Sequence, residues 1–160
     1  MGAKFPFEKH TRVAWVPTLS DMDLPNAVEI AAGTELTCHL TKDGLNPGGS
    51  TNGIDSGALC NNIDGQIAGS VGFSATLKFF RYDDDDTAWD LVNWGDEGYL
   101  VVRRGPAYDT VWGVSQPVEV YKAQFGEPIV SGSASNTLTT FEVSLFVDDA
   151  DQKAVIGASS

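Results

Sequence analysis

Cysteine and histidine are scarce in this chain of 160 residues, which contains two of each. Cys38 and Cys60 are too few for a disulfide framework and form no CxxC pair. We expect both to be buried thiols in strand-like segments, with a disulfide between them as the open alternative. Adjacent residues of a strand point to opposite faces, so His39 and Cys38 do not converge on a zinc ion with Cys60. His10 and His39 also leave little material for histidine-based catalysis.

Basic residues and long apolar runs are scarce as well. The chain has 22 acidic and 10 basic residues, for a formal net charge of −12. This balance excludes a basic surface that grips nucleic-acid phosphates and disfavours docking on an anionic membrane. The longest apolar run, residues 99–102, is far below the roughly 20 residues that span a bilayer. The first ten residues contain no apolar stretch of signal-peptide length, so we expect a cytoplasmically made protein with no membrane partner.

The motifs of the common enzyme classes are also missing. The chain has no P-loop, G-x-G-x-x-G, G-x-S-x-G or H-E-x-x-H pattern. The acidic run at residues 83–86 fails the EF-hand pattern, because Ala88 stands where glycine is needed and Trp94 where glutamate is needed. This run is typical of a charged turn before a helix, and a looser Ca²⁺ site is its alternative. We therefore expect no enzyme, no catalytic residue and no cofactor.

What the chain does contain is a period of two. Apolar residues from Val71 to Phe79 alternate with small or polar ones, as do residues 141–147. Shorter strands are expected at residues 12–16, 36–40, 58–61, 99–104, 110–114 and 118–125. One short helix is expected at residues 87–94, with Asp86 as its N-cap and Gly95 as its stop. The pattern predicts a mainly β fold, an antiparallel β-sandwich or partly closed barrel with one short flanking α-helix.

Two segments differ in composition from this β-rich part. Residues 42–57 contain five glycines, which predicts a long loop, and such loops are usually functional or disordered. Residues 1–11 form a predicted N-terminal arm with mixed charge. The expected organisation is therefore this arm, a single β domain at residues 12–150 and a C-terminal tail at residues 151–160.

Several short motifs occur in a characteristic order. They are RVAWVP at residues 12–17, the stretch 25–36, KDGL at residues 42–45, the strand at 69–81, GYLVVRRG at residues 98–105, and QPV at residues 116–118. In this order and spacing they resemble the major tail proteins of bacteriophages with long, non-contractile tails, most closely those that infect actinobacteria. The similarity runs through most of residues 12–147.

This resemblance implies a structural protein of the virion, assembled in the host cytoplasm. In the family, six-membered rings joined by long β-hairpins stack into a tail tube. The implied partners are other copies of the chain, the tape measure protein, and the tail terminator and distal tail proteins. The candidate contacts between copies are Phe5, Phe7, Leu45, Asn46, Asn52 and Ile54.

DNA would pass through such a tube without being specifically bound. An acidic lining would repel the phosphates from the wall, and Glu119 and Glu142 are the candidate lumen residues. The alternative from another class is a monomeric β-sandwich module of a phage or cell-surface protein that binds carbohydrate or Ca²⁺.

Overall fold

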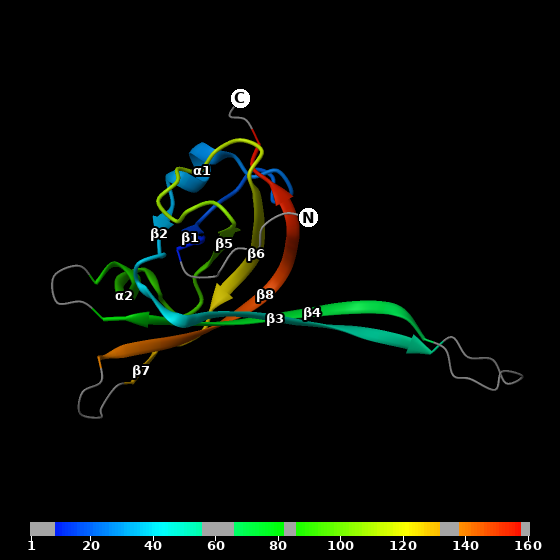
Figure 1. Ribbon diagram of the computed structural model, residues 1–160. Helices are drawn as coiled ribbons and strands as arrows, with labels where there is room; N and C mark the ends of the chain where they lie inside the picture. Colours follow the sequence, from blue (N-terminus) through cyan, green and yellow to red (C-terminus); the bar gives the residue numbers. More distant parts are fainter. Residues whose placement is uncertain (1–8, 56–65, 82–85, 132–137, 158–160) are drawn as a thin grey trace, which may run out of the picture.

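The computed structural model describes residues 9–55, 66–81, 86–131 and 138–157 (Figure 1). Within them lie eight strands and two short helices. In chain order these are β1 (Thr11–Val16), α1 (Ala27–Ala31), β2 (Thr34–Glu35), β3 (Leu40–Asp55), β4 (Gln66–Phe80), α2 (Thr87–Leu91), β5 (Glu97–Arg104), β6 (Pro117–Phe125), β7 (Ile129–Ser131) and β8 (Thr140–Val155).

All eight strands belong to one sheet, in which every pairing is antiparallel. The order across the sheet is β2-β1-β5-β6-β8-β4-β3, and β7 adds to β8 beside the end of β6. The predicted mainly antiparallel β fold is therefore confirmed. The five-residue helix α1, whose N-cap Asn26 accepts a hydrogen bond from the Val28 amide, was not predicted.

The larger hydrophobic core lies inside a curl of this sheet. Val13 and Trp15 of β1 pack in the same cluster as Leu77 and Phe79 of β4. Three strands separate β1 from β4 in the sheet order, so the sheet must bend back on itself to bring them together. The rings of Trp15 and Phe125 meet with their centroids 4.1 Å apart. The curl resembles a partly closed barrel more than two separate layers.

A second core covers the other face of the central strands. Ala14 of β1 and Val101 of β5 are buried in it, although their neighbours in sequence point into the larger core. Ile30 of α1 packs in this core, and Ala154 of β8, paired with Val118 of β6, extends it across the sheet. The central strands are therefore buried on both sides, which explains why residues 99–102 read as a continuous apolar run.

Arg103 organises the connection between β5 and β6. Its side chain is fully buried and donates hydrogen bonds to the carbonyl oxygens of Ala107 and Val111, at 2.9 and 3.1 Å, and to Oε1 of Gln116 at 3.1 Å. Burial lowers the pKa of Arg103. One charged side chain thus holds three points of an irregular segment together.

Helix α2 is shorter than the predicted helix at residues 87–94. It ends where Val92 adopts an extended conformation and enters the larger core. Asp86 is the N-cap, but its side chain makes no capping hydrogen bond and accepts one from Nε of Arg81 at 2.7 Å. The Arg81 guanidinium also lies 4.1 Å from the ring centre of Trp89. Packing of both helix ends, rather than capping, sets the length of α2.

Strand β3 occupies the segment that the glycine content had predicted to be a loop, residues 42–57. The prediction is wrong for this stretch because β3 pairs with β4 along most of its length. Glycine disfavours a strand intrinsically, but backbone hydrogen bonds to a long partner override that preference. Residues 56–57 and the predicted strand at 58–61, with Cys60, lie outside the described residues.

Three other predictions of local structure are also wrong. Residues 36–39 form a turn that enters β3 at Leu40, and Cys38 is exposed there rather than buried. Residues 110–114 form a loop instead of a strand, and the predicted tail at 151–160 begins inside β8. In each case the packing of an apolar side chain, which the sequence pattern does not show, decides the local structure. Leu36 packs in the larger core, and Trp112 and Ile156 pack in the second core.

Gly98 provides a test of the packing around Trp15. A Cβ atom at Gly98 would lie 2.6 Å from Cζ2 of Trp15, whereas a Cβ at Gly72 would meet nothing within 4 Å. Because an overpacked core has to shift, we expect Gly98→Ala to lower the free energy of unfolding by about 1–3 kcal/mol. Chemical denaturation of both variants measures the difference. Equal stability of Gly98→Ala and the matched Gly72→Ala would contradict this account of the core.

Candidate assembly surface

A two-stranded hairpin leaves the body of the molecule. Strand β8 pairs with β4 only as far as the pair Ser74–Phe146, while β3 and β4 stay paired to Asp55 and Gln66. We call residues 49–55 and 66–73 the hairpin arm. At about 3.3 Å per residue it extends roughly 25 Å. Figure 1 shows it projecting to one side of the body.

The hairpin arm has no third strand among the described residues. Along both of its outer edges, no neighbouring described strand forms hydrogen bonds with the backbone N–H and C=O groups. An isolated two-stranded hairpin is marginally stable in water, and open edges favour pairing with another chain. The arm therefore presents open edges with which the backbone of another strand can pair.

One face of the arm continues the core face of β4. Phe73 is partly buried and contacts the ring of Tyr121 with a centroid distance of 6.2 Å, and Val71, the next residue on that face, is 52% exposed. A register shift between Thr51 and Gly53 then places one extra residue on β4. Ile54, also exposed, lies three residues beyond Thr51, the partner of Val71, so the alternation of side chains along β3 places it on the opposite face from Val71.

The face of β4 and β8 that points away from the larger core has no covering element among the described residues. Residues directly opposite each other on neighbouring strands share a face, so the register places Ser74 with Phe146, Thr76 with Ser144, and Lys78 with Glu142. We call this the open face. Its described members are Ser50, Gly72, Ser74, Thr76, Lys78, Gln124, Ile129, Glu142, Ser144 and Phe146.

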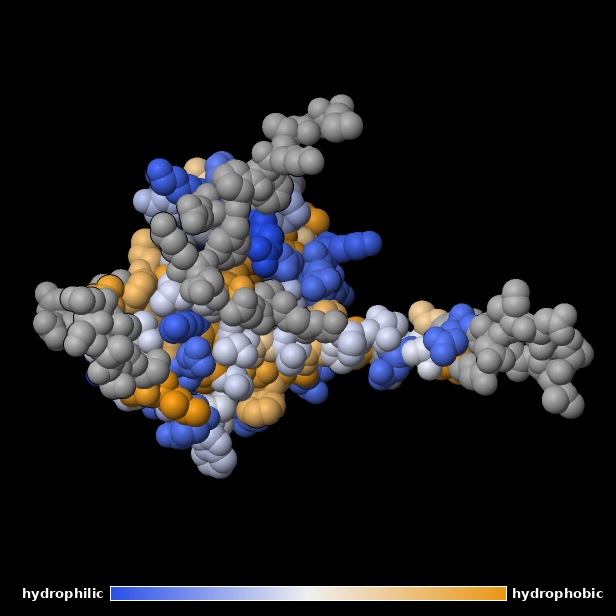
Figure 2. Space-filling view, turned by 60° about the horizontal axis from the view of Figure 1, so that its bottom comes forward, coloured by the Kyte–Doolittle hydropathy of each residue, from blue (hydrophilic) through white to orange (hydrophobic). Residues whose placement is uncertain are grey.

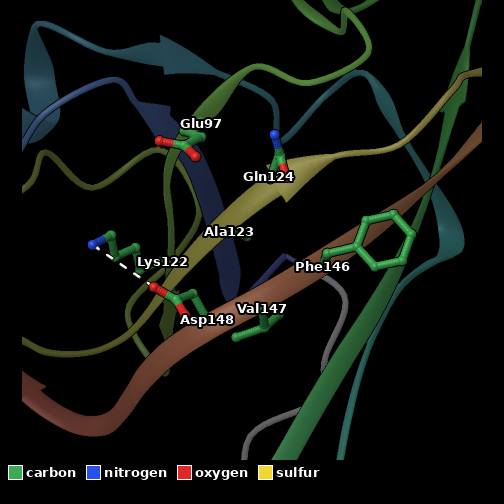
Figure 3. Close-up of a pocket in the computed structure, with 7 residues that line it drawn as sticks. All are labelled: Glu97, Lys122, Ala123, Gln124, Phe146, Val147 and Asp148. Atoms are coloured by element: carbon green, nitrogen blue, oxygen red, sulfur yellow. Dashed lines mark ion pairs between the residues drawn. The ribbon is translucent and has the colours of Figure 1, made fainter.

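A shallow groove of about 380 Å³ lies at the border of the open face (Figure 3). The Phe146 ring forms one wall, and Glu97, Lys122 and Asp148 surround the rest. Nζ of Lys122 lies 3.8 Å from Oδ2 of Asp148, a weak ion pair between exposed groups. The groove lacks a buried polar group that could orient a small ligand, which favours a surface contact over a ligand site.

Acidic side chains gather far from the arm, where β8 ends. A side-chain hydrogen bond with Asp151 and then the negative charge of Asp151 raise the pKa of Asp23 above its ordinary value. Desolvation and the charges of Asp21 and Asp149 add to this shift. We call these four residues the acidic patch.

The structure places the predicted contact residues in different environments. Leu45 is buried in the larger core, so its side chain is already used within the subunit. Asn52 and Ile54 are exposed on the hairpin arm, and Asn46 lies in β3 closer to the body. Phe5 and Phe7 lie outside the described residues, as does most of the predicted N-terminal arm. Val71 and Phe73, which extend the core face, were assigned only to a strand.

The two predicted lumen carboxylates do not lie together. Glu119 pairs with Nε of Arg104 and accepts a hydrogen bond of 2.7 Å from the Tyr121 hydroxyl. Burial and then this hydrogen bond raise the pKa of Tyr121 to about 12. Glu142 is exposed on the open face, opposite Lys78. Of the two carboxylates, only Glu142 is therefore exposed on the open face.

Metal and membrane sites find no support in the described part of the chain. No group of three or more His, Cys, Asp or Glu side chains there is placed to hold a metal ion. Within the acidic run at residues 83–86, the described residue Asp86 is bound to Arg81. No described helix has the length and hydropathy needed to cross a bilayer.

Comparison with known proteins identifies one family. A family model described as phage tail tube protein matches residues 1–159. Among solved structures, the chain is similar to the SPP1 tail tube, with a TM-score of 0.62 and 11% identity over 94% of this chain and 80% of that one. It is also similar to a chain of the anti-feeding prophage baseplate, with a TM-score of 0.53 and 12% identity over 98% of both. No curated protein sequence matches.

The acidic patch gives a pH-dependent prediction. A carboxyl whose pKa is raised by folding binds its proton more tightly in the native state, so the fold loses stability as the pH rises through that pKa. We expect Asp151→Asn to raise the melting temperature slightly at pH 7 in low salt, because it removes the main repulsion on Asp23. The gain should shrink toward pH 4 and in high salt.

Thermal melts of Asp109→Asn, which removes the same charge outside the patch, provide the control. If the melting temperature at pH 7 rises no more for Asp151→Asn than for Asp109→Asn, repulsion within the acidic patch does not destabilise the fold.

Proposed function

This chain belongs to the phage tail tube protein family, and we propose that it builds the tube wall as stacked rings of six copies joined through the hairpin arm. Its function is structural: it is a component of the phage tail and assembles with copies of itself into the tail tube. The predictions of a tail tube protein and of a non-enzymatic role are confirmed.

The observation that carries the proposed mode of assembly is the unsupported hairpin arm. It extends roughly 25 Å beyond the last pair with β8 and offers open backbone edges and the exposed Val71. A neighbouring copy that adds a strand to this edge would satisfy the backbone groups and cover Val71. A head-to-tail contact of this kind closes into a ring or continues as a helix.

Rings of six are supported by the symmetry of one structural relative. The anti-feeding prophage baseplate, which shares the fold, is described as six-fold symmetrised. Stacking of the rings would use surfaces away from the ring contact. Phe5, Phe7, Asn46, Asn52 and Ile54 stay the proposed contacts between copies.

The remaining parts of the proposal come from the resemblance in sequence. The tape measure protein would fill the tube, the terminator and distal tail proteins would bind its ends, and DNA would pass without being specifically bound. Assembly would take place in the host cytoplasm. A long non-contractile tail and an actinobacterial host complete the proposal.

Val71→Asp tests the role of the arm. The substitution would bury an unpaired charge in the contact between copies, so we expect the concentration needed for tube formation to rise about tenfold or more. Val71 lies outside the subunit core, and the melting temperature of the isolated subunit should stay the same. Sedimentation velocity and negative-stain electron microscopy of the concentrated protein measure both the polymer and its shape.

Gly72→Asp is the matched control, because it adds the same charge at the next residue on the opposite face of the arm. We expect it to form tubes. Equal assembly of the two variants would contradict the proposed contact, and an unsubstituted chain that remains monomeric at every concentration would favour a binding module instead.

A further inference from the structure

The upper half of β8 has a single neighbouring strand. Strand β4 pairs with β8 only as far as Phe146, and beyond it the one described strand that pairs with β8 is β6. We call residues 147–155 the β8 edge. Figure 1 shows it, in orange to red, rising along the side of the body above the arm. It is longer than a typical strand of about 5–6 residues, so a strand of a second copy has room to pair with it.

Aspartate side chains bind backbone groups of this edge. Oδ1 of Asp149 accepts a hydrogen bond from the amide of Ala150 at 2.8 Å. Oδ1 of Asp151 accepts one from the amide of Lys153, also at 2.8 Å. A strand that paired with the β8 edge would have to displace these side chains before it formed hydrogen bonds with the same amides. Local hydrogen bonds therefore compete with strand addition.

The end of β8 is covered by the backbone of the segment that precedes α1. The amide of Val155 donates a hydrogen bond to the carbonyl oxygen of Asp23 at 3.4 Å, and the amide of Gly157 donates one to the carbonyl oxygen of Pro25 at 2.8 Å. These donors at the end of the β8 edge are thus also bound within the subunit.

Two bulges interrupt the pairing of β8 with β6. Register shifts occur between Val118 and Val120 and between Lys122 and Ala123 of β6, and each leaves one extra residue on β8. Asp148 is the extra residue of the second shift, and its side chain is 78% exposed. Because a bulge bends its strand and increases the local twist, the β8 edge is a poor template for a straight partner strand.

The β8 edge also carries negative charge. Asp148, Asp149 and Asp151 lie on it, with Lys153 as its one basic residue. Figure 2 shows hydrophilic residues, in blue, on the side of the body where Figure 1 places the upper half of β8. Two β8 edges brought side by side would place like charges next to each other, which disfavours pairing between them.

A side chain also binds the backbone at the opposite margin of the sheet. Strand β2 is only two residues long, and next to it the Thr37 hydroxyl accepts a hydrogen bond from the Val13 amide at 3.0 Å. The same hydroxyl lies 3.3 Å from the Val13 carbonyl oxygen, to which it donates. A hydroxyl thus replaces a partner strand at this point of β1. The body therefore binds its edge amides with side chains at two separate places.

On the basis of the proposed assembly, we propose that Asp149 and Asp151 close the β8 edge to strands of other copies and so direct strand addition to the hairpin arm. The excluded partner is a strand of a second copy, which would otherwise find two competing edges on each subunit. Edges that pair indiscriminately give aggregates instead of a defined polymer. With the β8 edge closed, the arm remains as the long edge that a neighbour can extend.

The closed edge should reduce the stability of the isolated subunit. Asp149 and Asp151 belong to the acidic patch, where their charges act on Asp23. Aspartate is also among the residues that strands disfavour. Natural proteins accept such a loss of stability where a side chain prevents wrong pairing. Prevention of wrong pairing gives the acidic patch a role that the stability of the fold does not explain.

Asp149→Val and Asp151→Val, introduced together as the valine pair, test the closed edge. They remove both hydrogen-bonding carboxylates and supply β-branched side chains that favour strands. At a concentration at which the unsubstituted chain forms tubes, we expect irregular aggregates that bind thioflavin T. The dye-binding material that sediments should increase about tenfold or more. Thioflavin T fluorescence of the pellet and negative-stain electron microscopy measure the amount and the shape.

Two further double variants separate the causes. Asp90→Val with Asp109→Val removes two exposed carboxylates elsewhere on the subunit and should form tubes without aggregates. Asp149→Asn with Asp151→Asn keeps a side-chain oxygen for each amide and should aggregate less than the valine pair. Aggregation of the Asp90 and Asp109 control equal to that of the valine pair would overturn the inference. Equal aggregation of the asparagine and valine variants would overturn the role given to the hydrogen bonds.

Lys153→Pro tests the same edge from the opposite direction. Proline removes the amide that Asp151 binds, and edges and bulges are the places where a sheet tolerates proline. Because a closed edge takes no part in assembly, we expect this variant to form tubes at the concentration that the unsubstituted chain requires. A folded Lys153→Pro subunit that forms no tubes would show that the β8 edge is a contact between copies and would overturn the inference.

Thermal melts show whether aggregation of the valine pair arises from the edge or from unfolding. Because the valines remove repulsion from Asp23, the pair should melt no lower than the unsubstituted chain. If it melts lower, the Lys153→Pro result decides. Failure of the unsubstituted chain to form tubes would overturn the proposed function, whereas aggregation of a stable valine pair above its control would still support the closed edge.

Discussion

The structure depends on one strand that serves two environments. The body half of β4 contributes Ala75, Leu77 and Phe79 to the larger core, and its other half continues into solvent as one side of the hairpin arm. Because side chains alternate along a strand, the face that is apolar in the body stays apolar at Val71. The fold therefore cannot bury its core strand fully without a second molecule.

The glycine-rich segment illustrates what the sequence could and could not predict. Strands that alternate cleanly, such as β4 and β8, were found because half-burial imposes a period of two. Strand β3 was missed because its glycines and polar residues carry no burial signal: along the arm it is held by backbone hydrogen bonds to β4. A strand of 15 residues in β4, longer than one core requires, was the available sign that a partner strand existed.

The candidate surface was less predictable than the fold. The alternation of apolar residues predicts that Val71 lies in the core, although it is exposed, because this alternation does not show where the body of the molecule ends. Glu119 and Glu142 read alike as strand carboxylates, yet one is bound by Arg104 and the other faces solvent opposite Lys78. These differences arise from register between distant strands, which composition does not encode. Order of motifs along the chain, by contrast, was sufficient to indicate the family.

The unbroken course of β4 also has a mechanical consequence. No turn separates the arm from the body between Gln66 and Phe80, so tension applied to the arm passes along the covalent backbone into the core. There β4 is joined to β8 by consecutive pairs from Ser74–Phe146 to Phe80–Thr140. Their hydrogen bonds lie across the strands, and a pull along β4 loads them together in shear instead of one at a time. Each subunit thus resists extension at the same strand that forms the projecting arm.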